Sequence, residues 1–268
     1  MTLEIVRPDS VRSAAEMLAS PHARFVAGGT IAVRVWNSGD VSIKKLVLAD
    51  GLGLDAISVA NGRAEIGAAV TMAEVAAHPD LAFLHPVARE IGGPAIRAMA
   101  TVGGNLFARS PYGDFAVALL ALDAEVTVED ARAKKTLALA AFLAARDRQR
   151  GIVRSVAFAL PPAGALRFAK VMRRHPHGAS VLSIAAMLPL ASGRLKGVRI
   201  AYGAMAPTAI RATAVEKALE GKALDEASIA DAVAVAGEGT APASDAFASD
   251  WYRRNVLPVH LARLLRGE

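Results

Sequence analysis

The fold of this chain is decided by the stretch Ala100-Thr101-Val102-Gly103-Gly104-Asn105, which sets two glycines between a hydroxyl and an amide side chain. A similar stretch, residues 25–32 (FVAGGTIA), runs from an apolar strand into two glycines and a threonine. In such turns consecutive backbone N–H groups converge on one point and bind phosphate without a charged side chain. Each loop alone is a weak signal, because ordinary strand-to-helix turns share it. The two loops are too close together for two nucleotide domains, so they predict a clamp on one pyrophosphate.

Asp114 lies shortly after the second loop and is able to accept hydrogen bonds from a ribityl chain or a ribose. A helix cap before Phe115 is the alternative interpretation, and the two roles are compatible. Residues 51–56 (GLGLDA) fit a dinucleotide fingerprint, but that motif requires a long helix next, and an Asn61-Gly62 hairpin is predicted there instead. His175-Pro176-His177 has no carboxylate or cysteine nearby, so a solvated turn is a better interpretation than a metal site.

Composition excludes several classes of protein. With 53% hydrophobic and 21% charged residues the chain is globular. It has no cysteine, which excludes disulfides, thiolate nucleophiles and iron–sulfur clusters held by its own cysteines. The net charge of +6 comes from Lys and Arg residues that are scattered along the sequence. Only three tyrosines and two tryptophans are available to stack on bases, so a basic face for an acidic protein partner is favoured over nucleic-acid binding. No apolar run of about 20 residues and no secretory signal is visible, which predicts a cytoplasmic protein and leaves peripheral membrane association open.

Strand-like and helix-like segments alternate along the chain, which indicates an α+β fold. The spacing of Thr71 and Glu74 predicts a capping box at the start of a helix. Residues 161–164 (PPAG) form the best linker, because two prolines continue neither regular element, and the chain is divided near residue 163. The expected strands are 4–6, 24–27, 45–48, 57–59, 64–68, 125–129, 166–172 and 197–202; the expected helices are 11–18, 84–91, 116–122, 137–145, 213–219, 225–236 and 251–265.

Together these motifs resemble the FAD-binding medium subunit of the xanthine dehydrogenase and carbon monoxide dehydrogenase family of molybdenum hydroxylases. The resemblance covers nearly the whole chain, and the order and spacing of its motifs make it specific. Besides the two glycine loops, it rests on Val6-Arg7-Pro8, Ile96-Arg97, Lys170, Arg173-Arg174, residues 203–208 (GAMAPT), Arg211-Ala212, Glu216, Gly221 and Tyr252-Arg253-Arg254.

The resemblance implies a FAD-binding domain of the vanillyl-alcohol-oxidase (PCMH) type at residues 1–163, with subdomains at about 1–55 and 56–163. A smaller α+β domain of the CO dehydrogenase flavoprotein type would occupy residues 164–268. Position by position it places pyrophosphate on both loops, Ile91 and Lys170 beside the flavin ring, and Asp114 on the cofactor. The implied cofactor-binding residues are Val26, Ala27, Gly28, Gly29, Thr30, Ile31, Ala32, Ile91, Thr101, Gly103, Gly104, Asn105, Asp114 and Lys170. No catalytic or metal-ligating residue is expected in this chain.

The family also implies partners. A large subunit would hold the molybdenum cofactor, a small subunit two [2Fe-2S] clusters, and the assembly would be a dimer of heterotrimers that passes electrons through FAD to an external acceptor. Lys170 would stabilise negative charge on reduced flavin, with an ordinary surface salt bridge as its alternative. The sequence departs from the family pattern at Ile31, where relatives often have Asp or Ser, and around His177, where many members have an acidic residue.

The sequence leaves two other functions open. One is a freestanding FAD-dependent oxidase or reductase of the same fold, although little sequence is left over for a substrate domain. The other is a scaffold that has lost FAD, against which the intact glycines of both loops argue. The substrate (carbon monoxide, an aldehyde, a purine or an N-heterocycle) and the acceptor (quinone, NAD, oxygen or a carrier protein) are not specified by the sequence.

Overall fold

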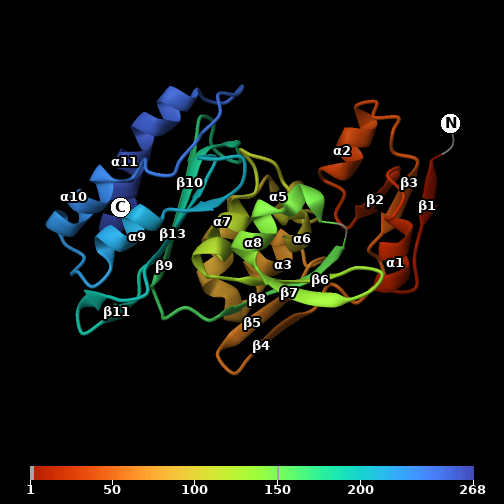
Figure 1. Cartoon of the computed structure of the whole chain (residues 1–268), viewed down its shortest axis with the longest axis horizontal. Coiled ribbons are helices and arrows are strands. Elements are labelled where there is room, and N and C mark those ends of the chain that lie inside the picture. Colours follow the sequence, from red (N-terminus) through yellow and green to blue (C-terminus); the bar gives the residue numbers. More distant parts are fainter. Residues whose placement is uncertain (1–2, 150) are drawn as a thin grey trace.

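The computed structural model describes residues 3–149 and 151–268, and three parts follow one another along its long axis (Figure 1). The N-terminal part is a small parallel sheet with strand order β1-β3-β2, flanked by two helices. The side chain of Ser10 accepts a hydrogen bond from the Ser13 amide and so caps the first helix. The elements of this part are β1 Glu4–Val6, α1 Val11–Met17, β2 Ala23–Val26, α2 Ala32–Asn37 and β3 Lys45–Leu48.

The middle part is an antiparallel sheet with strand order β4-β5-β8-β6-β7, covered by short helices. Its strands are β4 Ile57–Ala60, β5 Arg63–Gly67, β6 Glu125–Glu129, β7 Lys134–Ala138 and β8 Ile152–Ala159. Its helices are α3 Met72–Ala77, α4 His85–Arg89, α5 Pro94–Arg97, α6 Val102–Leu106, α7 Asp114–Ala121 and α8 Leu139–Ala144, with 3-10 turns η1 Pro79–Leu84 and η2 Arg146–Arg148.

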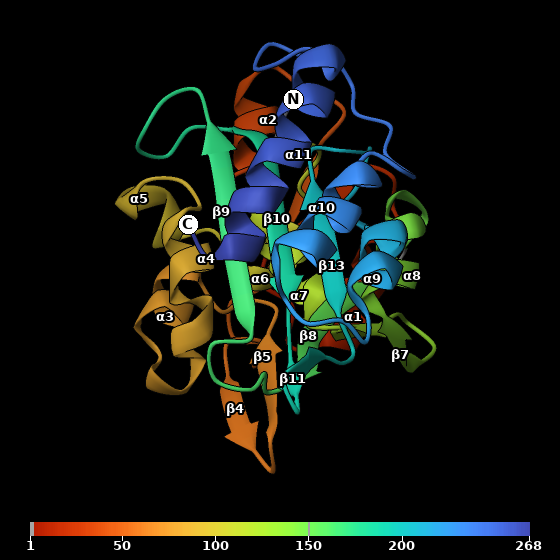
Figure 2. The same cartoon turned by 90° about the vertical axis from the view of Figure 1, so that its left-hand side faces the viewer.

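The C-terminal part is an antiparallel sheet with strand order β14-β13-β10-β9, and three helices cover the face turned toward the viewer in Figure 2. A small β11-β12 hairpin extends from it. Its elements are β9 Leu166–Met172, β10 Ser180–Met187, β11 Leu190–Ala191, β12 Arg194–Leu195, β13 Arg199–Gly203, β14 Ile210–Arg211, α9 Thr213–Leu219, α10 Glu226–Ala234 and α11 Asp250–Arg266. The exposed segment 162–164 joins β8 to β9.

Helix α7 forms the common core of the middle and C-terminal parts. All of its residues are buried, because the helix lies between the middle part and the face of the C-terminal sheet opposite α9–α11 (Figures 1 and 2). Its core cluster includes Ala185, Met187 and Ala201 of that sheet. A helix that is apolar all round is stable only when it is covered on every side. The C-terminal sheet therefore stabilises α7 by covering one of its sides.

Most of the elements expected from the sequence are present, and the α+β class is confirmed. Asn61 and Gly62 have φ values of 51° and 72°, as a type I′ hairpin requires, and Thr71 and Glu74 form the expected capping box. The helix expected at 137–145 was placed too early, since residues 137 and 138 pair with β6 as the end of β7. Strand β10 was missed: all its residues are buried, so it lacks the polar alternation that marks a strand.

Candidate cofactor site

The first glycine loop, residues 27–32, presents a row of backbone donors. It follows β2, whose last residue Val26 is buried, and leads into α2. Within the described part of the chain, the amide N–H groups of residues 27–32 donate no hydrogen bond. Gly29 has a φ of 69°, a conformation that favours glycine. Unpaired amides are costly unless water or a ligand accepts from them, so this partly exposed loop is suited to an anion.

The second glycine loop, residues 101–105, is organised differently although its sequence is similar. The Val102 amide donates to Val70 O at 2.9 Å, the Gly103 amide to Ala68 O at 2.8 Å, and the Asn105 amide to Thr101 O at 2.9 Å. The Gly104 amide donates to the Thr101 side-chain oxygen at 3.1 Å. Thr101 therefore caps α6, and most donors of this loop are already used inside the protein.

The first loop touches the two residues that lead into the second loop. A Cβ atom on Gly28 would lie 1.5 Å from the carbonyl oxygen of Met99 and 3.3 Å from the amide nitrogen of Ala100, the residue before Thr101. Only glycine permits two backbones to approach so closely. Gly104, in contrast, is exposed, and a Cβ there would meet only the Thr101 side-chain oxygen, at 2.9 Å. The structure thus places the two predicted loops next to each other and leaves Gly104 of the second loop exposed.

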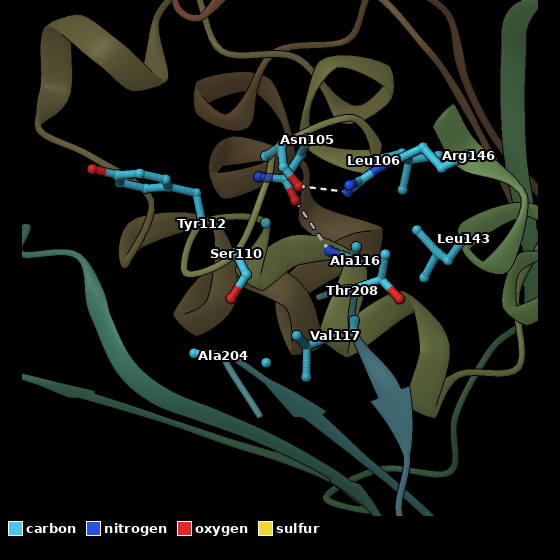
Figure 3. A pocket seen from close by; sticks show the side chains of 14 residues that line it. Asn105, Leu106, Ser110, Tyr112, Ala116, Val117, Leu143, Arg146, Ala204 and Thr208 are labelled. Carbon is cyan, nitrogen blue, oxygen red and sulfur yellow. Dashed lines mark hydrogen bonds between the residues drawn. The ribbon is translucent and has the colours of Figure 1, made fainter. Parts of the chain in front are cut away.

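A hydrogen bond connects the second loop to α7. The side-chain oxygen of Asn105 accepts from the amide of Ala116 at 3.1 Å, one of the contacts drawn in Figure 3. Asp114, the first residue of α7, has a buried side chain. Its carboxylate lies 3.0 Å from Lys170 Nζ on β9 and accepts a hydrogen bond of 2.7 Å from Ser180 on β10. The salt bridge of Lys170 is therefore buried, which excludes the alternative of an ordinary surface pair.

The turn beside Ile91 completes this cluster. Lys170 Nζ donates a second hydrogen bond, of 2.7 Å, to the carbonyl oxygen of Glu90. Arg97 Nη1 donates to the carbonyl oxygens of Arg89 and Gly92 at 2.8 and 2.5 Å, which closes the turn. Ile91 is partly buried against the core cluster of the middle part. The predicted residues Ile91, Asp114 and Lys170 therefore lie around one buried ion pair.

His177 lies near the same turn. It follows a cis His175-Pro176 bond in the exposed loop between β9 and β10 and has a φ of 71°. Its Cδ2 atom is 3.7 Å from the position of a Cβ on Gly93. The residue that departs from the family pattern is therefore next to the 90–93 turn, whereas the other departure, Ile31, is an exposed side chain of the first loop.

A small cavity lies on the C-terminal side of the second loop (Figure 3). Its lining includes Asn105, Ser110, Thr208 and the buried Arg146, which donates to the carbonyl oxygen of Ala108 at 2.8 Å. The cavity volume is about 10 Å³, which is room for about one water molecule. This cavity is therefore too small for a dinucleotide.

Arg253 explains part of the Tyr252-Arg253-Arg254 motif. Its side chain is fully buried and donates from Nε to Val181 O at 2.8 Å and from Nη2 to Asp245 at 2.8 Å. It also donates to the carbonyl oxygens of Ala243 and Ala248. Burial opposes ionisation of Asp245, but the amides of Phe247 and Ala248 and the Arg253 guanidinium outweigh it and lower the pKa of that carboxyl. The segment 243–248 is thereby fixed against β10 next to Ser180.

For three residues that make contacts in this region, the sequence alone predicts no such contact. Ser180 and Arg146 had no role assigned, and Arg97 was recognised only as part of a motif. Ser180 is an isolated serine and carries no local signal; its position depends on the antiparallel pairing of β9 and β10. Arg146 follows an apolar helix, which was the only indication that its stem is buried.

Within residues 3–149 and 151–268, no cluster of His, Asp and Glu side chains suits a metal ion. In the same residues no helix is long and apolar enough to cross a membrane.

Comparison with known proteins identifies the family of both domains. The family model "FAD binding domain in molybdopterin dehydrogenase" matches residues 1–161, and "CO dehydrogenase flavoprotein C-terminal domain" matches residues 167–267. The glyceraldehyde dehydrogenase medium chain of Sulfolobus acidocaldarius is 28% identical over 66% of this chain and 64% of its own length. The carbon monoxide dehydrogenase medium chain of Afipia carboxidovorans is 27% identical over 96% of this chain and 93% of its own.

A solved structure of a Cu,Mo-CO dehydrogenase in its cyanide-inactivated form has a chain with the same fold. The TM-score is 0.88 at 25% identity, and the match covers 99% of this chain and 97% of that one. The two family models cover nearly the full length, in the order that the resemblance implied. The chain belongs to the family of FAD-binding medium subunits of the molybdenum hydroxylases, and it is an oxidoreductase flavoprotein subunit.

Proposed function

We propose that this chain binds FAD in an extended form and that loop 27–32 holds the pyrophosphate. The observation that carries this proposal is the run of unbonded amides in residues 27–32, which lies against residues 99–100, just before the second loop. Consecutive amides of this kind form a fixed positive field for an anion. Val26 ends the strand that presents the loop, and Ile31 contributes its backbone rather than a polar side chain.

The second loop has a different task in this proposal. Because its amides are mostly bonded, residues 101–105 act by close approach: exposed Gly104 leaves room for phosphate, and Thr101 and Asn105 fix the shape of the loop. Gly103 packs against Ala68, with a Cβ position only 2.7 Å from the Ala68 Cβ. The loop therefore supplies a rigid wall opposite the donors of the first loop.

In this proposal the flavin end of the cofactor lies at the cluster around Asp114. Ile91 offers an apolar side chain at the 90–93 turn, and Asp114 offers a carboxylate for hydroxyl groups. Lys170 contributes a buried positive charge, which Asp114 balances at 3.0 Å. FAD, when bound, supplies the redox chemistry, and the protein binds and orients it.

The chain would then serve as the electron outlet of a complex. We propose a large partner subunit with the molybdenum cofactor, a small partner with two [2Fe-2S] clusters, and an external acceptor for the electrons, in a dimer of heterotrimers. The absence of cysteine supports this division, since clusters with cysteine ligands need another chain. The carbon monoxide dehydrogenase and glyceraldehyde dehydrogenase medium chains are each, by their names, one chain of a dehydrogenase with several chains.

We further propose that the two domains divide near residue 163. The segment 162–164 is exposed, and Gly164 has a φ of 71°. The family models end and begin on either side of it, at residues 161 and 167. Limited proteolysis tests the division, because the most accessible cleavage sites are expected in this segment.

Substitution of Gly104 tests FAD binding most directly. In Gly104→Val a branched side chain stands at the open side of the second loop, so we expect FAD binding to be abolished. The measurement is the visible flavin absorbance of the purified full chain and its change on titration with FAD. Gly237→Val is the matched control, because a Cβ at Gly237 meets nothing within 4 Å. Flavin absorbance in Gly104→Val equal to that of the control would contradict the assignment.

The electron-outlet role predicts that the chain alone oxidises no organic substrate. The two family models match residues 1–161 and 167–267, and both describe parts of a flavoprotein. The measurement is dye reduction by the FAD-loaded chain with carbon monoxide, aldehydes, purines and N-heterocycles. Native purification with identification of co-purifying chains, metal content and visible spectrum provides the complementary result. Turnover by the chain alone would favour a freestanding oxidase or reductase.

A further inference from the structure

Polar groups from separate segments meet at the carboxylate of Asp114. One oxygen accepts from Ser180 Oγ at 2.7 Å, and the other lies 3.0 Å from Lys170 Nζ. The side chains of Asp114 and Lys170 are 6% and 4% exposed, and Ser180 is 1% exposed. Asp114 begins α7 in the FAD-binding part, whereas Lys170 and Ser180 belong to strands of the C-terminal sheet. The contacts therefore cross from one part of the molecule to the other.

A buried ion pair is costly to form, because both charges lose their hydration. It persists only where further hydrogen bonds satisfy the remaining donors and acceptors. Here Lys170 gains a second acceptor, the carbonyl oxygen of Glu90, and Asp114 gains a second donor, Ser180. The pair thereby fixes the start of α7 and the turn beside Ile91 at the same time.

We propose that Lys170 and Ser180 are positioning residues of the flavin site that act through the Asp114 carboxylate. This inference rests on the proposed function, and it adds that the C-terminal sheet sets the geometry of a site whose glycine loops lie elsewhere. Ser180 anchors one carboxylate oxygen and Lys170 the other, so the rotation of the carboxylate is blocked. Asp114 then meets the cofactor's hydroxyl groups in one fixed orientation.

The geometry favours action through Asp114 over direct action of Lys170 on the flavin. The charge of Lys170 is balanced at 3.0 Å, and another of its N–H groups is held by Glu90 O. A balanced and buried ammonium contributes little field beyond its partner. Removal of Lys170 alone leaves the Asp114 charge buried without compensation, and this effect is larger than the loss of any direct field of Lys170 at the flavin.

The first experiment compares two buried serines in the full-length protein. Ser180→Ala removes the hydrogen bond to Asp114, and Ser155→Ala is the matched control, since Ser155 is 7% exposed and donates to Glu65 at 2.6 Å far from this cluster in sequence. We expect Ser180→Ala to weaken FAD binding about tenfold, the effect of losing one hydrogen bond to a charged group, and Ser155→Ala less than about twofold. The measurement is the dissociation constant of FAD from fluorescence titration.

The second experiment is a double-mutant cycle with Asp114→Asn, Lys170→Met and the double variant. Lys170→Met is expected to weaken FAD binding most, because it leaves a lone buried carboxylate. The double variant removes both charges and keeps an acceptor for Ser180, so it should recover at least about tenfold of that loss. The visible circular dichroism of bound flavin reports whether the ring regains its wild-type orientation, which a change in overall stability alone does not alter.

Three outcomes overturn the inference. In the first, Ser180→Ala and Lys170→Met both bind FAD like the wild-type protein. In the second, the double variant recovers none of the FAD affinity lost in Lys170→Met, which assigns Lys170 a direct role on the flavin. Equal losses in Ser180→Ala and Ser155→Ala indicate a general stability effect. A wild-type chain that binds no FAD refutes the proposed function itself. The free energy of unfolding of the cofactor-free variants shows whether a variant that loses FAD has lost its stability instead. If Lys170→Met does not fold, the two serine variants decide.

Discussion

The two glycine loops are alike in sequence but differ in the hydrogen bonding of their backbone amides. In the second loop the amides of residues 102–105 donate to residues 68, 70 and 101, whereas in residues 27–32 the amides donate to no group of the described chain. The first loop precedes a helix without a buried residue, and the second lies on the core of the middle part. The same pattern of two glycines therefore supplies donors in one place and a rigid, closely packed wall in the other.

This difference shows that a glycine motif specifies backbone shape rather than binding. Gly28 is required because another backbone lies against it, and Gly103 because it packs on Ala68. A phosphate site arises only where such a shape also leaves amides unbonded. Substitutions in each loop test whether this division of tasks between the loops holds.

The largest expected effect is at the contact between the loops. In Gly28→Ala the new Cβ would overlap the carbonyl oxygen of Met99, so the loops have to separate. We expect a loss of about 3 kcal/mol in the free energy of unfolding, as for severe overpacking, together with loss of FAD binding. Denaturant titration with Gly237→Ala as the control measures it. A stable Gly28→Ala with wild-type affinity would show that the loops need not touch.

A smaller effect distinguishes the two threonines. The Thr101 side chain caps the second loop, whereas the Thr30 side chain makes no hydrogen bond within the described residues. Thr101→Val should lower the free energy of unfolding by about 1 kcal/mol, and Thr30→Val should change it by less than about 0.5 kcal/mol. Thermal or denaturant unfolding of the cofactor-free chain measures both, and Thr101→Ser should restore the cap. Equal costs for the two valine variants would remove the contrast between the loops.

The positions of both loops were predictable from the sequence because glycine pairs after apolar residues are local signals. The Asn61-Gly62 hairpin and the Thr71 capping box were predictable for the same reason. The state of the loop amides was not, since it depends on Ala68 and Val70, which are distant in the chain. Strand β10 and its Ser180 also escaped prediction, because burial on both faces removes alternation and pairing with β9 is a tertiary property.

The smallest expected effect concerns pH and the turn after α2. Hydrogen bonds from the Ser42 side chain and amide lower the pKa of Asp40 below its usual value. A lowered pKa means that this carboxylate stabilises the turn above its unfolded-state pKa and that the contribution is lost as pH falls through the folded-state pKa. In a Trp251→Phe background, Trp36 on α2 should show a small fluorescence change in that acid range.

Asp40→Asn supplies the control for this pH effect. It lacks the titrating group, so the acid transition of Trp36 should disappear. A transition that persists unchanged in Asp40→Asn would assign it to another carboxylate and leave the turn after α2 independent of pH.

The burial of α7 has a consequence for the order of events during synthesis. Residues 114–121 leave the ribosome early, but β10 and β13, which cover one side of them, are made later. In the interval a fully apolar helix has no cover on that side, and such surfaces aggregate. Asp114 likewise meets Lys170 and Ser180 only after β10 is complete. Cofactor insertion is therefore expected only after β10 and β13 have been made and packed on α7, and a transient chaperone contact with α7 before that.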